Sequence, residues 1–453
     1  MRVCFFVLLA VGPCFGQYKS VNPQIAKIVE SVSEQRITEI LKKLEGFGTR
    51  NLLSTQTDPT RGIGAARQWI YNQFRSYSPK LEVSYDQYKV KKINEPNSRV
   101  PRDVDLYNVV AVLPGKVHPR QRILISGHYD TLVLKGPTGN STAAGETPPA
   151  GDPNGHEPGV SDNASGTSCV MELARVLSQY EFDKTIVFIA FAGEEEGLIG
   201  STLYAAKAKK AGQQIEAVLN NDIIGFEASA SGRTDSRRVN VFSDDPADSP
   251  SRTLARYARE IGERYVPMMK VDNVFRSDRV NRGGDHTAFS LEGYAGVRFS
   301  SPQENLANEH TVTDTFANTS PGYIARVTKV NGAVAASLAL APKSPDISEQ
   351  VERNGKKTTR LFLTRGTSRS DAVLKWKHEP EADLAGYAVV VRSTTSPYWE
   401  RDVFVGKANE YTFSDLSIDE LVFGVKAVDK DGNESLVSPY VPVGRPKRVI
   451  ETY

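Results

Sequence analysis

TIVFIAFAGEEEGLIGS, residues 185–201, joins a run of apolar residues directly to three glutamates. Buried strands do not normally end in three like charges, because neighbouring carboxylates repel one another and burial disfavours their ionised forms. The cluster is therefore either a solvated turn or a set of acids beside a positive partner. The apolar run and the glycine that follows the acids favour the second interpretation, with a metal ion as the candidate partner.

Predicted strands and helices alternate around this stretch. Strands are predicted at 106–115, 122–128, 184–193 and 214–226, and helices at 62–77, 162–180, 198–212, 251–265 and 320–340. This alternation predicts an α/β fold with a mixed, mainly parallel sheet flanked by helices. In such folds ligands bind at the carboxyl ends of the strands. We expect this domain to occupy residues 17–342.

The first residues are typical of a short secretory signal peptide. Residues 1–16, MRVCFFVLLAVGPCFG, contain one arginine, about ten apolar residues and small residues near the end. The apolar run is too short to span a membrane, and Pro13 directly before Cys14 argues against a lipid anchor. We expect cleavage after Gly16 and a secreted, periplasmic or extracellular protein. Only Cys169 would remain, so no internal disulfide is expected.

The length and charge of the chain indicate a soluble protein of several domains and favour neither nucleic acid nor a membrane as a partner. At 453 residues two or three domains are expected, and 39% hydrophobic with 24% charged residues is typical of a soluble globular protein. A formal net charge of only +2 gives no reason to expect nucleic acid or an anionic membrane as a partner.

The pattern changes after residue 342. Short alternating strands are predicted at 373–380, 386–394, 411–416, 421–429 and 434–440. They predict an all-β sandwich at 350–445, after a linker at 343–349 and before a tail at 446–453. Trp376, Tyr387, Tyr411 and VKAVDKDGNES (425–435) resemble a fibronectin type III domain. Such a domain is either a spacer or a contact surface for polysaccharide or another protein.

Histidines and carboxylates occur at the ends of other predicted strands. SGHYD (126–130) places His128 and Asp130 on the same face of a strand, where the carboxylate can hold the imidazole of a metal-bound histidine. GVSDNASG (159–166) places Asp162 before a helix, and this aspartate alone is typical of an N-cap.

Asp222 and His310 complete the set of candidates. NNDIIGF (220–226) ends a strand at Asp222, and EHTVTDT (309–315) gives His310 with a carboxylate, Asp314, four residues later. Two histidines with three carboxylates are a natural ligand set for a pair of divalent ions, zinc first. A glutamate left uncoordinated beside water activated by such ions is the arrangement expected of a general base.

In this order, SGHYDT, GVSDNASG, FAGEEEGLIGS, NNDIIGF and EHTVTDT resemble the motifs of the co-catalytic zinc aminopeptidase family, which includes secreted bacterial leucyl aminopeptidases. The resemblance covers about residues 25–342 and implies a zinc exopeptidase fold with two Zn²⁺ ions per chain. It implies metal ligands at His128, Asp162, Glu195, Asp222 and His310.

The resemblance also implies a role for each residue. His128 and Asp222 each hold one end of the metal pair, Asp162 bridges the ions, and Glu195 with His310 completes the second site. The implied catalytic residues are Glu194, as general base, and Asp130, as the carboxylate behind the first histidine. Glu196 stands at a position that the family does not use for metal, and a cis peptide is implied between Asp162 and Asn163.

The implied activity is hydrolysis of N-terminal residues from peptide or protein substrates. Carboxypeptidases and glutaminyl cyclases share the scaffold, but the presence of both Asp162 and Asp222 favours a two-metal hydrolase over a one-metal cyclase. No clear cluster of basic residues is available to receive a terminal carboxylate, which favours an aminopeptidase. A different class is an inactive surface-binding protein that acts through its β-sandwich, and the intact ligand set argues against it.

Three further features lie near the expected cleft. GGDHTAF (283–289) resembles a family segment that brings Asp285 near the active site, whereas His286 is expected to be a packed, hydrogen-bonded histidine. Arg279 and Arg298 are candidates to contact a carbonyl or carboxylate of the substrate. The loop 133–161, between the first two ligand motifs, is either a functional rim over the cleft or a disordered insertion.

Overall fold

The structure is a computed structural model that describes residues 19–95, 98–134, 150–280, 282–353, 355–378 and 380–441. The chain divides into two compact units. One is Pro23–Ala341, and the other contains the described residues 342–441 together with residues 19–22. The predicted signal peptide and tail, and most of the predicted rim loop (135–149), lie outside the described residues.

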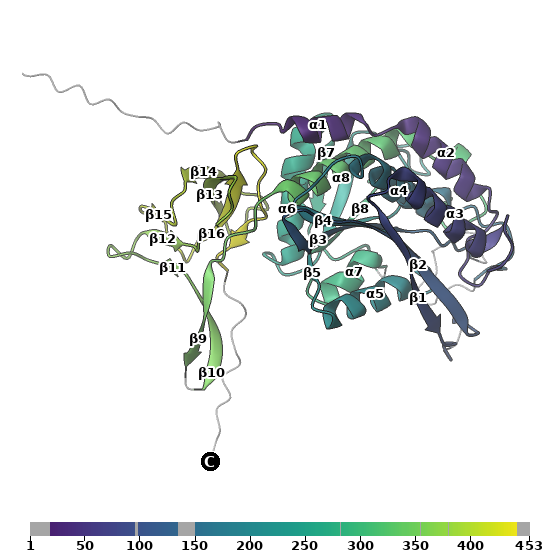
Figure 1. Ribbon diagram of the computed structural model, residues 1–453, viewed down its shortest axis with the longest axis horizontal. Coiled ribbons are helices and arrows are strands. Elements are labelled where there is room, and N and C mark those ends of the chain that lie inside the picture. The colour runs from purple at the N-terminus through teal and green to yellow at the C-terminus, as the bar shows by residue number, and fades with distance from the viewer. Residues whose placement is uncertain are drawn as a thin grey trace, which may run out of the picture. The chain divides into compact units, whose positions relative to one another are not determined.

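One eight-stranded sheet forms the centre of the first unit, in the order β1-β2-β4-β3-β5-β8-β6-β7 (Figure 1). Its strands are β1 (Glu82–Val90), β2 (Val104–Leu113), β3 (His118–His128), β4 (Lys184–Phe191), β5 (Gln214–Asn221), β6 (Arg238–Ser243), β7 (Lys270–Val274) and β8 (Gly296–Ser300). The neighbours β4, β3, β5 and β8 run parallel, as do β6 and β7, whereas β1/β2, β2/β4 and β8/β6 are antiparallel. The predicted mixed, mainly parallel sheet is therefore confirmed.

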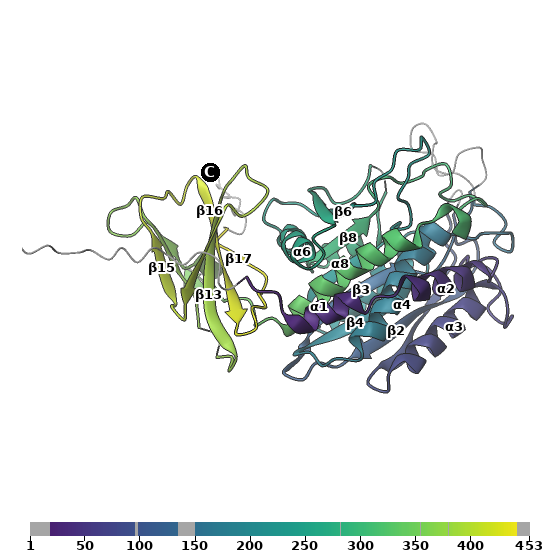
Figure 2. The ribbon, with the colours of Figure 1, turned by 90° about the horizontal axis from the view of Figure 1, so that it is seen from above.

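Helices cover both faces of this sheet. They are α1 (Pro23–Glu30), α2 (Glu34–Glu45), α3 (Gly62–Tyr77), α4 (Ser165–Leu177), α5 (Ile199–Lys210), α6 (Pro250–Tyr265), α7 (Asp285–Leu291) and α8 (Pro321–Leu340), with the short turns η1 (Val160–Ala164) and η2 (Phe316–Asn318). Helices α3, α4, α6 and α8 contact one face, with α1 and α2 packed against α8. Helices α5 and α7 pack together on the other face (Figure 1), and Figure 2 shows the first layer from above.

Local sequence explains where these elements begin and end. The side chain of Ser320 accepts the backbone N–H of Tyr323, and Pro321 occupies the first turn, so α8 has both features of a favoured helix start. Every residue of β4 is buried. Phe191, Tyr204 and Phe289 form a buried aromatic cluster between the sheet and helices α5 and α7. The strand that precedes the three glutamates is thus packed on both faces.

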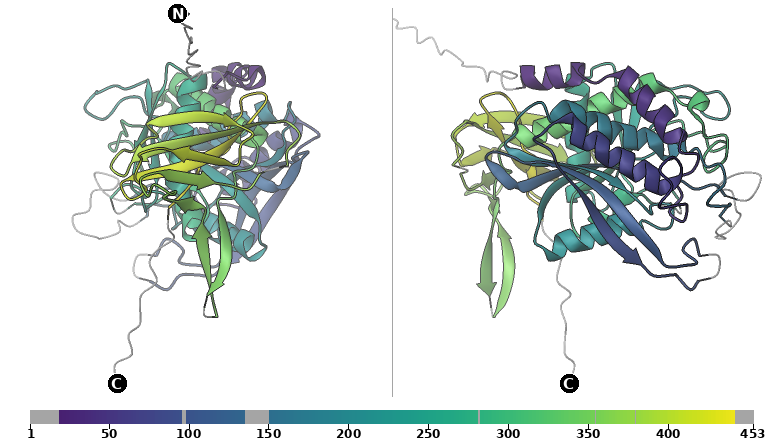
Figure 3. Two further views of the ribbon diagram at one scale, coloured as in Figure 1. Left: turned by 90° about the vertical axis from the view of Figure 1, so that its left-hand side faces the viewer. Right: turned by 45° about the vertical axis from the view of Figure 1, so that its right-hand side comes forward.

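The second unit is all β. Its sheets are β9 (Ser348–Arg353) with β10 (Lys356–Leu361); β11 (Leu363–Thr364), β12 (Ala372–Lys375) and β15 (Glu410–Phe413); and β14 (Arg401–Gly406), β13 (Leu384–Ser393), β16 (Leu421–Asp429) and β17 (Ser438–Pro439). All their pairings are antiparallel. The β9/β10 ribbon extends away from the other two sheets (Figure 3).

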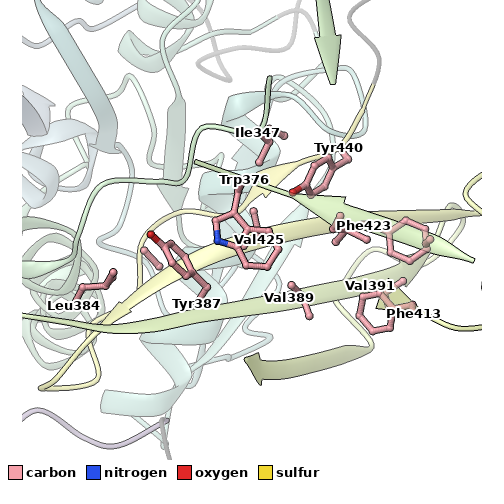
Figure 4. Close-up of a cluster of buried hydrophobic side chains, with 13 residues drawn as sticks. Ile347, Trp376, Leu384, Tyr387, Val389, Val391, Phe413, Phe423, Val425 and Tyr440 are labelled. Atoms are coloured by element: carbon pink, nitrogen blue, oxygen red, sulfur yellow. The ribbon is translucent and has the colours of Figure 1, made fainter. Parts of the chain in front are cut away.

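A shared core joins the three-stranded and four-stranded sheets of this unit. Trp376, Tyr387, Phe413, Phe423 and Val425 pack together in it (Figure 4). The predicted β-sandwich is therefore confirmed, whereas its fibronectin type III character stays a prediction. Among the described residues of the whole chain, no helix combines the length and the apolar composition needed to cross a membrane.

Candidate metal centre

Four parallel strands bring the predicted site residues to one edge of the sheet. His128 is the last residue of β3, Asp222 follows the end of β5, and the glutamates follow β4 after a two-residue connection. Because β4, β3 and β5 are adjacent and parallel, their carboxyl ends meet. The turn η1 supplies Asp162, and the loop after β8 supplies His310.

Asp162 lies between the two histidines. Its Oδ1 is 3.2 Å from Nε2 of His128, and its Oδ2 is 3.0 Å from Nε2 of His310. The residue before helix α4 is Ala164, which makes no side-chain cap, and the backbone at Asp162 is not helical (φ −112°, ψ 92°). The N-cap interpretation of Asp162 is therefore wrong. The peptide bond from Asp162 to Asn163 is cis, as the resemblance implied.

Each histidine also faces a carboxylate of its own. Nε2 of His128 is 3.5 Å from Oδ1 of Asp222, and Nε2 of His310 is 3.1 Å from Oε2 of Glu195. The five predicted ligands thus form two groups that share Asp162.

The two groups fit zinc. A tetrahedral zinc ion with bonds of about 2.0–2.1 Å separates its ligand atoms by roughly 3.3 Å, close to the separations of 3.0–3.5 Å found between these donor atoms. Among the described residues, neither the buried Nε2 of His128 nor the buried Oε1 of Glu195 has a hydrogen-bond partner. Imidazole with carboxylate is also a donor set that suits zinc.

Asp130 connects two of the candidate ligands. Its Oδ1 is 3.5 Å from Nδ1 of His128, and its Oδ2 accepts the backbone N–H of Glu195 at 3.1 Å. The structure therefore places Asp130 behind the histidine as expected, and adds a link to the glutamate segment that the sequence did not indicate. A carboxylate in this position orients the ring and raises its basicity.

The three consecutive glutamates have different surroundings. Glu194 is 13% exposed, and its Oε2 is 4.0 Å from Nε2 of His128. Burial and the carboxylates of Asp222, Glu195 and Asp285 raise the pKa of Glu194 well above its usual range, although His128 lowers it. Glu196 is buried, and its pKa is raised well above the usual range by burial and then by Asp130 and Glu195.

Negative charge exceeds positive charge in this site. Burial alone would lower the pKa of His310, but Glu195 and Asp162 raise it to about 10. Glu194 and the three aspartates around His128 likewise raise the pKa of His128 well above its usual range, against the effect of burial. Bound divalent cations would balance this excess of carboxylates.

Asp314 has a role that the sequence did not indicate. The sequence predicts a carboxylate available to His310, but Oδ1 of Asp314 accepts the N–H of Ser161 at 2.8 Å and its Oδ2 accepts the N–H of Asp162 at 2.9 Å. Both oxygens therefore hold the segment that carries Asp162.

Arg50 likewise has a structural role that the sequence does not indicate. It is fully buried, and its guanidinium donates to the backbone carbonyls of Leu44, Tyr129, Pro158 and Gly159 at 2.7–3.1 Å. One side chain thus connects α2 with the segments that follow His128 and precede Asp162. The only signal in the sequence is an arginine within the connection between two predicted helices, which does not reveal such contacts.

The two arginines considered for substrate contact are both engaged by carboxylates. Nη1 of Arg298 donates to Asp278 at 2.8 Å, and its Nε is 3.1 Å from Oδ2 of Asp222. Nε of Arg279 donates to Asp278 at 3.0 Å, and its Nη1 donates to Glu304 at 3.2 Å. Their assignment as substrate contacts is not supported, because each guanidinium already has acidic partners.

The other predictions near the cleft concern Asp285, His286 and the loop 133–161. Asp285 is buried near the site, and burial raises its pKa to about 7, with Asp130 and Asp222 adding to the shift and His128 opposing it. His286 is buried with its Nε2 2.8 Å from the carbonyl of Ser277, which confirms a packed, hydrogen-bonded histidine. The rim role of loop 133–161 stays a prediction, because residues 135–149 are outside the described part.

Comparison with known proteins identifies the class to which this site belongs. The model of Peptidase family M28 matches residues 108–335. A probable zinc metalloprotease of Pyricularia oryzae is 38% identical over 441 residues, which cover 89% of this chain and 82% of that protein. The chain is thus a zinc metallopeptidase. It belongs to peptidase family M28.

Solved structures share the fold of the first unit. The LapA aminopeptidase of Legionella pneumophila superposes with a TM-score of 0.52 at 21% identity, over 71% of this chain and 76% of that one. A glutaminyl cyclase of Macrostomum lignano gives 0.52 at 14% identity, over 74% and 96%. The same fold therefore occurs in an aminopeptidase and in a glutaminyl cyclase, so the reaction of this chain must be inferred from its site residues.

Proposed function

We propose that the chain is an exported aminopeptidase that uses two zinc ions and a glutamate base to remove N-terminal residues from peptides. The observation that carries the proposal is the carboxylate of Asp162, which has one oxygen facing each of two histidines. A carboxylate in this position could bridge two metal ions.

The ligands would divide into two sets around this bridge. His128 and Asp222 would hold one ion, and Glu195 and His310 the other, with Asp162 common to both. Zinc bound there would supply a Lewis acid that polarises the scissile carbonyl and lowers the pKa of water.

Glu194 is the group best placed to move protons. Its Oε2 is 4.0 Å from Nε2 of His128, and it is the least buried of the three glutamates. A carboxylate beside the ligand set can take a proton from water and return it to the leaving amine. Asp130 would keep the ring of His128 oriented while Glu194 does so.

The charge of the site supports an amino end rather than a carboxyl end as the group recognised. Glu194, beside the proposed ligands, can accept a hydrogen bond from a substrate amine, whereas a terminal carboxylate would meet a second carboxylate there. Arg279 and Arg298 are engaged by Asp278, Glu304 and Asp222, which leaves them unsuited to receive a terminal carboxylate.

Export is proposed from residues 1–16 alone, whose sequence is typical of a signal peptide. Mass spectrometry of the N-terminus of the protein recovered from the producing cells tests it. A mature chain that starts at Gln17 is expected, and an intact N-terminus on a protein retained inside the cell would refute export.

Peptide hydrolysis tests the reaction. The zinc-loaded protein should release the first residue from free peptides and none from their N-acetylated forms, since acetylation removes the amine. Release from the carboxyl end would indicate a carboxypeptidase. Conversion of an N-terminal glutamine to pyroglutamate without hydrolysis would indicate a cyclase.

Two variants test the assignment of roles. Glu194→Gln should lower kcat by about 10²–10⁴-fold or more, with zinc content still near two per chain. Asp162→Asn should lower the zinc content itself. Glu39→Gln, at an exposed position of α2, is the matched control and should change neither quantity. Normal turnover in Glu194→Gln would refute the assignment of the base.

A further inference from the structure

Arg298 makes three contacts next to a proposed metal ligand. It lies on β8, and it is fully buried. Its Nε is 3.1 Å from Oδ2 of Asp222, its Nη2 donates to the main-chain carbonyl of Asp222 at 3.2 Å, and its Nη1 donates to Asp278 at 2.8 Å. One guanidinium therefore holds both the side chain and the backbone of Asp222.

The guanidinium is itself fixed in place. Asp278 accepts from Arg298 and also accepts from the backbone N–H and Nε of Arg279, at 2.6 and 3.0 Å. The planar fork of an arginine presents its donors in a fixed geometry, whereas the ammonium of a lysine is a point charge that does not fix the direction of its contacts. The direction from which Arg298 meets Asp222 is thus determined by residues outside the metal centre.

The two oxygens of Asp222 consequently face different partners. Oδ2 is turned to Arg298, and Oδ1 is turned to His128, at 3.5 Å from Nε2. The proposed position of the second ion, at Glu195 and His310, has no such arginine among the described residues. In the part of the chain that the structure describes, no arginine or lysine forms an ion pair with the carboxylate of Glu195, and Arg99 reaches only its backbone carbonyl, at 2.5 Å.

We propose that Arg298 is a positioning residue for Asp222. By engaging Oδ2 and the main-chain carbonyl, it leaves Oδ1 as the single atom of Asp222 directed at a zinc ion shared with His128. The proposal rests on the proposed function, and it concerns one of the two metal positions. It implies that zinc binding by His128 and Asp222 depends on Arg298, whereas zinc binding by Glu195 and His310 does not.

Zinc titration of the full-length metal-free chain, with free zinc set by chelator buffers, tests this. The wild-type chain should bind two ions. In Arg298→Met one binding step should remain as in the wild type, and the other should weaken by at least about tenfold, the usual effect of losing a partner that orients a ligand. Arg298→Lys keeps the charge but not the fork, and should recover only part of the loss.

A second pair of variants shows whether the effect passes through Asp222. Asp222→Asn should weaken the same step, and adding Arg298→Met to it should weaken that step no further, because the ligand through which Arg298 acts is already lost. The visible spectrum of cobalt bound in place of zinc should change in Arg298→Met for one ion and stay unchanged for the other. A general loss of stability would not produce this selectivity.

Controls separate misfolding from loss of position. Arg256→Met removes another buried arginine of the same unit, whose guanidinium donates to the carbonyl of Ala247, and should leave both steps unchanged. If Arg298→Met does not fold, Asp278→Asn serves as the test in its place. This variant removes the carboxylate that anchors the guanidinium of Arg298 but leaves the contact of Arg298 with Asp222. It should weaken the same step to a smaller extent.

The outcomes distinguish this inference from the proposed function. A wild-type chain that binds fewer than two ions would refute the proposed function and this inference together. Two ions in the wild type with unchanged titration of Arg298→Met, or with both steps weakened equally, would refute the inference alone. Additive effects of Arg298→Met and Asp222→Asn would do the same.

Discussion

The carboxylate of Asp314 accepts the backbone N–H of Asp162 at 2.9 Å, and that of Ser161 at 2.8 Å. The residue proposed to bridge two ions is therefore held from behind by a second aspartate from a distant part of the chain. These two hydrogen bonds orient a segment that lacks regular helical geometry at Asp162.

Asp314→Asn should weaken zinc binding by roughly 10–100-fold, because an asparagine has one acceptor oxygen where the carboxylate uses two. Its amide group would direct N–H bonds at one of the backbone N–H groups. Elemental analysis after dialysis at buffered zinc concentrations measures the effect.

Asp58→Asn is the matched control for this variant. Asp58 also accepts backbone N–H groups, from Thr60 and Arg61, but it lies in the loop before α3. It should retain zinc as the wild type does. Equal zinc retention in Asp314→Asn and the wild type would show that these hydrogen bonds do not support the centre.

Arg50→Met should lower the free energy of unfolding of the first unit by roughly 3–5 kcal/mol. It would leave the buried carbonyl groups of Tyr129 and Pro158 without their donor, and each such group costs about 1–3 kcal/mol where water cannot replace the donor. The carbonyl groups of Leu44 and Gly159 would each keep a backbone N–H donor, from Phe47 and Ala164. Denaturant unfolding followed by helical circular dichroism measures the change, since the helices of the described chain all lie in this unit.

Arg50→Lys supplies the comparison. A lysine retains the charge but carries three donors on one atom, so it should restore only part of the stability. A loss below about 1 kcal/mol in Arg50→Met would contradict the view that Arg50 joins the loops around the site.

Gly166→Ala should destabilise the first unit and reduce zinc retention. A Cβ atom at Gly166 would lie 2.0 Å from the carbonyl oxygen of Asn221, a backbone atom that cannot move aside without shifting the end of β5. Overpacking of this kind costs about 1–3 kcal/mol. Asp162 and Asp222 flank the contact on its two sides, so the distance between them should change.

Gly283→Ala tests whether the effect is specific. The nearest atom to a Cβ at Gly283 is 3.5 Å away, which is ordinary contact. Thermal unfolding and zinc content of both variants should differ from the wild type only for Gly166→Ala. Unchanged zinc retention in Gly166→Ala would mean that the close approach of α4 and β5 does not determine the site.

Trp376→Ala should destabilise the second unit by about 3–5 kcal/mol, because it leaves a cavity in the shared core. Trp376 is 3% exposed, and its ring lies 5.5 Å from that of Tyr387. Trp376→Phe should cost less, since among the described residues the indole N–H has no hydrogen-bond partner to lose. Calorimetry of the full chain should show the loss in one transition, with zinc content unaltered.

Much of this architecture could be predicted from the sequence because local patterns carry it. The alternation of apolar strands with amphipathic helices predicted the sheet, and helix α3 occupies the predicted residues 62–77. His128, Asp222 and the glutamates could be found because each follows a strand, and parallel neighbouring strands end at one edge.

The contacts that support the site had no such local pattern. Asp162 on its own was typical of a helix cap, and Asp314 was interpreted as a partner of His310 because the two are close in sequence. Arg50 and Arg298 act through residues 76 to 109 positions away. A single sequence contains no periodicity from which pairings of this kind can be inferred.

The contacts of Arg50 have a consequence for how the chain matures. Three of its four carbonyl partners lie 79 to 109 residues later in the sequence. The polypeptide between residues 50 and 159 must therefore be complete and arranged before this arginine can join its partners, and no short fragment contains the assembled centre. Uptake of both metal ions should accordingly be a late event, after synthesis has passed His310, the last of the proposed ligands, and after the segment around Arg50 has reached its native arrangement.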